Sequence, residues 1–227
     1  MSSRMLHLAV TEKLLAALPF SDPARLRIGS VLPDAELPVG FPPAKTAHFP
    51  LRLPGNRKTL DLTSFRERFS DRLLADDLVL GYYLHLAADV IHRDFFYKRT
   101  DWAPADAAAV RLLHRDYSLL NPWLVRAYGI RKEDAVPTAA VLDALASDPV
   151  LSGFSFDLKG FFSAMEGDFD ETVPLPLPED FTVFTEALAA EWIECAAGLL
   201  VRETASLRST GLSVLDERAM AWLKYTG

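Results

Sequence analysis

The sequence predicts an all-α protein: a single multi-helix domain spanning residues 1–227, built around a buried central helix, with a long proline-rich loop after the first helix. Two observations predict this class. Apolar residues recur at intervals of three and four along most of the chain, which is the spacing of amphipathic helices. Convincing alternating strands are absent, since the one weakly alternating segment, residues 48–54, carries prolines that restrict it to loop or a short edge strand. With 227 residues, 50% of them apolar, the chain has enough material for one generous core.

The first part of the chain is expected to hold one helix followed by a long loop. Leu6, Val10 and Leu14 have helical spacing, so an amphipathic helix is expected over residues 3–18. Residues 29–58 contain six prolines and read as irregular structure. Loops of this length inside a compact domain are usually either functional or disordered, and the apolar side chains in this one favour an ordered loop.

The remainder is expected to be helical, with interruptions at prolines and glycines. The expected helices cover residues 63–74, 76–97, 138–146, 157–165, 181–207 and 214–225. One more begins at Asp101 and Pro104, with Asp near the cap and Pro in the first turn. It runs towards Asn121, where Pro122 bends or breaks it, and Gly129 closes the segment that follows. Residues 172–180 form a second proline-rich connector.

Charge and cysteine content exclude several classes of protein. A net charge of −7 argues against a general affinity for the nucleic-acid backbone, which needs a basic surface. It leaves a phosphate-containing substrate open, because a bound metal can supply positive charge locally. The single cysteine, Cys195, rules out an intramolecular disulfide and a thiolate zinc cluster, and we expect it in the core. The first apolar run is broken by polar residues and no stretch is long enough to cross a bilayer, so we expect a cytoplasmic protein.

The expected central helix carries two histidines and an aspartate on one face. With 100° per residue, Asp89 lies about 40° from His85 and His92 lies about 20° away on the other side. The three side chains therefore share an arc of roughly 60°. The rest of the helix is apolar nearly all round, so it is expected to be buried, and Gly81 is expected to leave room beside the arc. Burying these groups costs several kcal/mol unless they are hydrogen-bonded or bind a metal, and both alternatives stay open.

Three earlier residues add ligand-type side chains in a definite chain order. His7 lies in the first expected helix, Asp34 follows a proline in the long loop, and His48 lies in the same loop. The order His, Asp, His and then His-x3-Asp resembles the zinc-dependent phospholipase C / P1 nuclease superfamily. The Asp belongs to a Gly-x-x-x-Pro-Asp segment that starts at Gly29, and the final pair is His85 and Asp89.

This resemblance implies an all-helical fold and a cluster of zinc ions. Asp34, His48, His85 and Asp89 would hold one zinc, and His7 would join Asp89, as a bridge, at a neighbouring one. A water bound there becomes a nucleophile towards a phosphoester, and Asp34 or Asp89 would act as the catalytic carboxylate that orients it.

The resemblance also implies further ligands, a substrate class and an alternative. His92 and His114 would be additional metal ligands, and we expect a reduced site with one or two zinc or other divalent ions. The expected partner is a phosphoester-containing small molecule or lipid headgroup. Arg93 and Lys98 either meet that phosphate or simply stabilise the end of their helix. The alternatives are a helical binding protein with a structural metal or none, and a metal-dependent hydrolase of another bond class.

Overall fold

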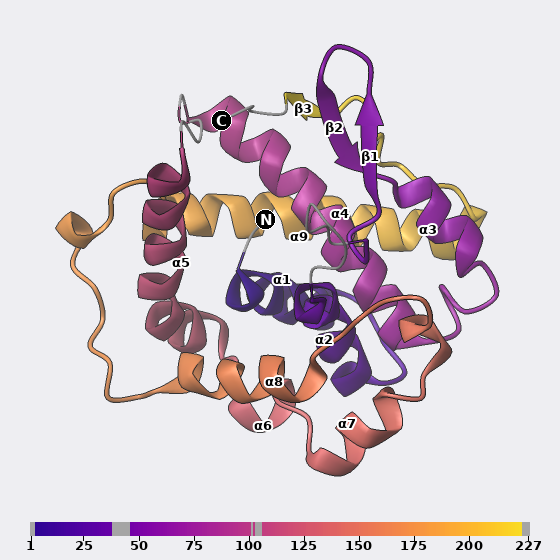
Figure 1. Ribbon diagram of the computed structural model, residues 1–227, viewed down its shortest axis with the longest axis horizontal. Coiled ribbons are helices and arrows are strands. Elements are labelled where there is room, and N and C mark those ends of the chain that lie inside the picture. Colours follow the sequence, from indigo (N-terminus) through magenta and orange to yellow (C-terminus); the bar gives the residue numbers. More distant parts are fainter. Residues whose placement is uncertain (1–2, 38–45, 101, 103–105, 224–227) are drawn as a thin grey trace.

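The computed structural model describes residues 3–37, 46–100, 102 and 106–223, and within them the all-α class is confirmed (Figure 1). The α-helices are α1 (Arg4–Ala17), α2 (Pro23–Val31), α3 (Leu62–Arg68), α4 (Asp77–Arg99), α5 (Ala107–Tyr128), α6 (Lys132–Ala135), α7 (Ala139–Leu145), α8 (Leu158–Glu166) and α9 (Glu186–Thr210). The 3-10 helices are η1 (Leu32–Ala35), η2 (Pro149–Leu151), η3 (Gly167–Phe169) and η4 (Pro178–Asp180). Three short strands, β1 (Pro50–Leu53), β2 (Arg57–Leu60) and β3 (Trp222–Leu223), form one small sheet.

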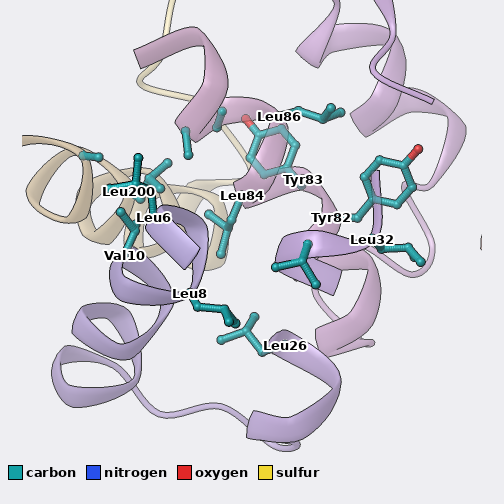
Figure 2. Packing of buried hydrophobic residues seen from close by; sticks show 14 of the residues in the cluster. Leu6, Leu8, Val10, Leu26, Leu32, Tyr82, Tyr83, Leu84, Leu86 and Leu200 are labelled. Atoms are coloured by element: carbon teal, nitrogen blue, oxygen red, sulfur yellow. The ribbon is translucent and has the colours of Figure 1, made fainter. Parts of the chain in front are cut away.

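The expected buried central helix is α4. Asp76 caps its first turn by accepting a hydrogen bond from the backbone N–H of Leu78, and Lys98 and Arg99 lie in its last turn. Both ends therefore complement the helix dipole. Side chains on every face of its first four turns are buried, because α2, α3 and α9 all pack against it. Figure 2 shows apolar residues of α1, α2, α4 and α9 in one cluster, including Leu8, Leu26 and Leu84.

The sequence-based prediction missed helix α2. Asp22 accepts a hydrogen bond from the N–H of Arg25, and Pro23 occupies the first helical turn, so this segment is a helix start rather than only the end of α1. The expected loop over residues 29–58 is correspondingly wrong in part. It contains the end of α2, then η1, β1 and β2, while residues 38–45 lie outside the described part of the chain.

Two glycines let α2 and α4 approach each other closely. A Cβ on Gly29 would lie 2.2 Å from the carbonyl oxygen of Leu78, and one on Gly81 would lie 2.3 Å from the carbonyl oxygen of Leu26. Only a residue without a side chain fits at either position. The prediction that Gly81 leaves room beside the histidines is therefore wrong, because the backbone of α2 fills that room.

The sheet accounts for the weakly alternating segment. β1 pairs antiparallel with β2, which pairs antiparallel with β3, so β1 is an edge strand as the prolines predicted. Gly55 and Asn56, both with positive φ, form the turn between β1 and β2. Figure 1 shows this hairpin standing beside α4 and α3.

The helix expected over residues 214–225 is wrong for residues 214–223. A buried carboxylate, that of Glu203, accepts hydrogen bonds from the backbone N–H groups of Val214 and Leu215. These bonds keep Val214 and Leu215 out of a helix, a turn follows over residues 217–220, and the chain then reaches β2 as strand β3. Long-range contacts therefore override the local helical pattern.

The other boundaries differ by smaller amounts. Helix α5 continues through Pro122 to the left-handed Gly129, because Leu120 and Leu124 on either side are buried and hold it in place. The expected start at Asp101 and Pro104 lies outside the described residues, and Asp106 caps the helix instead. The core assignment of the cysteine is wrong, since Cys195 is exposed on α9. None of the described helices is both long and apolar enough to span a membrane.

Candidate metal centre

Five predicted ligands converge on one point although they come from four separate segments. His7 lies on α1, Asp34 on η1, His48 on the turn before β1, and His85 and Asp89 on α4. The three histidines and Asp89 are buried, whereas the Asp34 side chain is 16% exposed. Such a concentration of buried polar groups requires hydrogen bonds or a metal.

Three donor atoms, on Asp34, His48 and His85, lie close enough together to hold one metal ion, and Asp89 lies near two of them. His48 Nε2 lies 3.3 Å from His85 Nε2 and 3.4 Å from Asp34 Oδ1. Asp89 Oδ2 is 3.9 Å from His48 Nε2 and 4.0 Å from His85 Nε2, and Asp34 Oδ1 is also 4.0 Å from His85 Nε2. Ligands about 2.0–2.1 Å from a zinc ion lie about 3.3–3.4 Å apart on a tetrahedron. The distances among the atoms of Asp34, His48 and His85, 3.3 to 4.0 Å, are therefore close to this value, and Asp89 Oδ2 is at 3.9–4.0 Å from the two histidine nitrogens.

A second group of candidate ligands, His7, His85 and Asp89, shares His85 with the group of Asp34, His48 and His85. His7 Nε2 lies 3.5 Å from Asp89 Oδ1, and the ligand atoms of His7, His85 and Asp89 are within 4.8 Å of one another. The His7 and His85 rings stack with their centroids 3.8 Å apart. Because Asp89 directs one oxygen towards His7 and the other towards His48 and His85, its carboxylate has the arrangement of a bridge between two ions.

The surrounding backbone sets the orientation of His85. Its Nδ1–H donates a hydrogen bond of 2.8 Å to the carbonyl oxygen of Ser30, the residue after Gly29. This bond places the ring proton on Nδ1 and leaves the Nε2 lone pair directed at the cluster. Outer partners of this kind fix the tautomer of metal-binding histidines. The close packing of α2 and α4 therefore also orients a ligand.

His48 is held by residues that the sequence did not single out. The buried Glu36 accepts hydrogen bonds from the N–H groups of Thr46 (2.8 Å) and Ala47 (2.7 Å), and Tyr82 donates its hydroxyl to the carbonyl oxygen of Ala47 (2.6 Å). These three bonds fix the turn that presents the imidazole. No local sequence pattern predicts these hydrogen bonds, because Glu36 is one of many acidic residues in the chain.

The protonation states suit metal binding. Burial alone would raise the pKa of Asp34, but the nearby His85 and the hydrogen bond from His48 outweigh it and lower the pKa to about 2. Burial and the neighbouring His7 lower the pKa of His85 to about 3. The pKa of Asp89 is also held well below its usual value despite burial, in part by the hydrogen bond from His7. At neutral pH the carboxylates are anionic and His85 is neutral, which is the state that coordinates metals.

The structure does not bring His92 into either group of ligands. Its ring is buried among Phe96, Phe184 and Trp192, and its Nε2 lies 3.2 Å from the hydroxyl of Tyr117. The predicted arc of three side chains on α4 therefore divides into two candidate ligands and one histidine packed among aromatic rings.

His114 also lies outside both groups, but at the entrance to the centre. It is exposed on α5 and lines a pocket of about 310 Å³ together with Asp34, Tyr117, Asn121 and Arg4. Of the five clustered ligands, Asp34 alone lines this pocket, and its side chain is the most exposed of the five. This pocket therefore borders the candidate metal centre at Asp34.

Comparisons with known proteins add no assignment. No family model matches the chain, and neither the curated proteins nor the solved structures gave a significant match. The geometry of the cluster and its pocket therefore carries the functional argument.

Proposed function

We propose that this protein is a metal-dependent hydrolase of phosphoester bonds, with zinc as the favoured ion and a metal-activated water as the nucleophile. The observation that carries the proposal is the convergence of five donors from α1, η1, the His48 turn and α4 in two groups that share His85, with Asp34 open to a pocket. Imidazole and carboxylate donors together suit zinc and other first-row divalent metals.

Each side chain has a distinct part in this proposal. His7, His48 and His85 provide neutral nitrogen ligands, and Asp89 supplies one oxygen to each side of the cluster. A bound metal would acidify water and stabilise negative charge on the phosphoryl oxygens. Asp34 borders both the cluster and the pocket, so its carboxylate is placed to orient the attacking water and accept its proton.

The charges of the pocket itself do not favour an anionic substrate, because the carboxylates of Asp34 and Asp168 line it beside Arg4. His114, Tyr117 and Asn121 line it, while the guanidinium of Arg4 and the amide of Asn121 are both held by the carboxylate of Asp168. A metal would supply the positive charge that the pocket lacks. The chain order of the ligands, which resembles that of the zinc-dependent phospholipase C / P1 nuclease superfamily, supports phosphorus as the site of attack.

One observation favours a second candidate, a structural metal. Four of the five donors have side chains no more than 5% exposed, as in a site closed by protein ligands. In that case the metal would stabilise the fold and the protein would act as a helical binding module. The two candidates differ in whether metal-loaded protein turns over a substrate.

Metal analysis combined with turnover tests the proposal. Protein purified without chelator is analysed for transition metals by mass spectrometry, before and after resupply with zinc or manganese. Hydrolysis of bis(p-nitrophenyl) phosphate and p-nitrophenyl phosphate is measured on the same samples. Stoichiometric metal with metal-dependent turnover is the expected result. Stoichiometric metal without turnover of either ester would favour the structural candidate, and no metal after resupply would contradict both.

The His114→Ala variant is a matched control for the ligand assignment. It removes an imidazole close to the centre that belongs to neither ligand group. We expect this variant to retain its metal. Loss of metal from His114→Ala would show that the ligand set is wrong.

A further inference from the structure

A second pocket lies on the other side of His48. Its volume is about 390 Å³, and it is bounded by the residues of β1 and β2, by Arg93 of α4 and by Trp222 of β3. It shares His48 with the metal centre, but none of the other four clustered ligands lines it. It is therefore distinct from the pocket that contains Asp34 and His114.

The lining of this pocket is positively charged in an acidic protein. Arg52, Arg57, Lys58 and Arg93 line it, and no carboxylate is found among its described lining residues. The chain as a whole has a net charge of −7. The cationic groups of Arg93 and Lys58 lie 5.4 Å and 5.9 Å from the centroid of the Trp222 ring, so both side chains gather at one wall. Such a concentration of one sign of charge attracts anions.

Three residues of the same lining carry buried polar atoms that lack a hydrogen-bond partner among the described residues. These atoms are Thr59 Oγ1, Trp222 Nε1 and His48 Nδ1. A hydroxyl can donate, and an indole nitrogen only donates. His48 Nδ1 becomes a donor whenever Nε2 coordinates a metal, since the ring proton must then lie on Nδ1. The lining residues thus include four cations and, when His48 binds a metal through Nε2, three hydrogen-bond donors without an acceptor among the described residues. A bound anion would supply that acceptor.

The position of His48 links this pocket to the metal centre. Its Nε2 faces Asp34 and His85, and the residue also borders the pocket. In many metal sites a carboxylate accepts the second ring N–H of a ligand histidine and strengthens the ligand. Within the described residues no protein carboxylate does so for His48.

We propose that this pocket is a binding site for a phosphate-bearing anion, which contacts Arg93 and Lys58 and completes the outer hydrogen bond of His48. The site goes beyond the proposed hydrolase activity and does not require the metal centre to be catalytic. The shared chemistry is a phosphate group, either free or on a lipid headgroup.

Calorimetric titration with inorganic phosphate at constant ionic strength tests the site. The full chain, as purified, is compared with the double variant Arg93→Gln/Lys58→Gln. We expect the double variant to weaken phosphate binding by about tenfold or more, since hydrogen bonds to charged groups are lost. Arg111→Gln removes an exposed cation of α5 outside this pocket, and should leave the affinity within a factor of two or so.

Further arms separate this site from the metal centre and identify the source of the phosphate. The His85→Ala variant should still bind phosphate. If binding disappears in His85→Ala and persists in Arg93→Gln/Lys58→Gln, phosphate binds the metal centre, and the pocket proposal is wrong while the hydrolase proposal stands. Equal affinity in the double variant and the wild type overturns the proposal by itself. Co-flotation with phosphatidic acid vesicles but not phosphatidylcholine vesicles, lost in the double variant, would assign the phosphate to a lipid headgroup.

Discussion

Helix α4 places two histidines, His85 and His92, in two very different environments. Both imidazoles are 1% exposed, and they lie two helical turns apart on nearly the same face. Around His85 the neighbours are His7, His48 and the two carboxylates of the cluster. Around His92 they are aromatic rings and one phenol. Burial on a common face therefore does not determine whether a histidine can bind a metal.

The difference comes from what the other elements present to each turn of α4. Near His85, α2 approaches closely through Gly29 and brings with it the carbonyl of Ser30 and the carboxylate of Asp34. Near His92, α5 and α9 contribute Tyr117 and Trp192. The same residue type is a candidate ligand in one place and an aromatic core residue in the other.

The largest expected effect is on metal binding, when His85 and His92 are each substituted in a separate variant. His85→Ala should weaken metal binding by more than about 100-fold, beyond the usual effect of an outer-shell change. His92→Phe should leave the metal bound, because it keeps an aromatic ring among aromatic rings and removes only the contact with the Tyr117 hydroxyl. Metal content and affinity of the two variants check the comparison. Equal metal loss in both would make His92 a ligand and remove the distinction drawn here.

A second prediction concerns the close contact between α2 and α4 at Gly81, near His85. Gly81→Ala forces a Cβ to within 2.3 Å of the Leu26 carbonyl, so α2 and α4 must move apart. We expect a loss of about 3 kcal/mol in the free energy of unfolding, measured by urea titration. Gly198→Ala is the matched control, because its Cβ would meet only Arg202 Nη1 at 3.9 Å. That variant should be stabilised by about 0.5–1 kcal/mol. A neutral Gly81→Ala would contradict the close contact.

Glu36→Ala tests the turn that carries His48. The variant leaves the N–H groups of Thr46 and Ala47 without their acceptor, so metal affinity should fall by about 10–100-fold. Glu203→Ala is the control, since it removes a buried carboxylate that also accepts backbone N–H groups, but beyond α9. Both variants should lose stability, whereas only Glu36→Ala should lose metal affinity. Equal metal affinities, determined by chelator competition on folded protein, would refute the positioning role.

The smallest expected effect is on the pH dependence of stability, to which His85 and His92 contribute in the same direction. Burial lowers the pKa of His85 to about 3 and that of His92 well below its usual value. Both are neutral when folded and take up a proton on unfolding below pH 6.5. Stability should therefore fall with falling pH, by about 1.4 kcal/mol per pH unit for each histidine. Denaturation of chelator-treated protein between pH 6 and about pH 5 measures this slope, and His92→Phe should reduce it. An unchanged slope in that variant would show that His92 is protonated in the folded state.

The parts of the fold predicted from sequence are those with local signals. The 3.6-residue period and the apolar surroundings fixed α4 to within two residues at either end. Helix α2 was not predicted, although Asp22 at its cap and Pro23 in its first turn form a helix start. The segment after α9 has a helical pattern, but hydrogen bonds to Glu203 and pairing with β2 keep it from forming a helix.

The candidate site divides in the same way. The chain order of His7, Asp34, His48, His85 and Asp89 predicted a group that the structure brings together. His92 shares the direction of His85 on the helix, but periodicity gives a direction only, and what lies opposite depends on other elements. Glu36 and Ser30 could not be predicted, because Glu36 accepts from backbone N–H groups and Ser30 accepts through its own carbonyl oxygen, and folding creates both contacts.

The contact between Gly29 and Gly81 has a consequence for altering the chemistry of the centre. The two helix backbones determine where Asp34, His85 and Asp89 stand, and neither glycine offers a donor atom. The ligand side chains could thus be changed without changing the backbone that positions them. Replacing Asp34 by histidine, or His48 by aspartate, would change which ions are preferred while the scaffold stays the same, so this pair of helices offers a fixed frame for engineering metal selectivity.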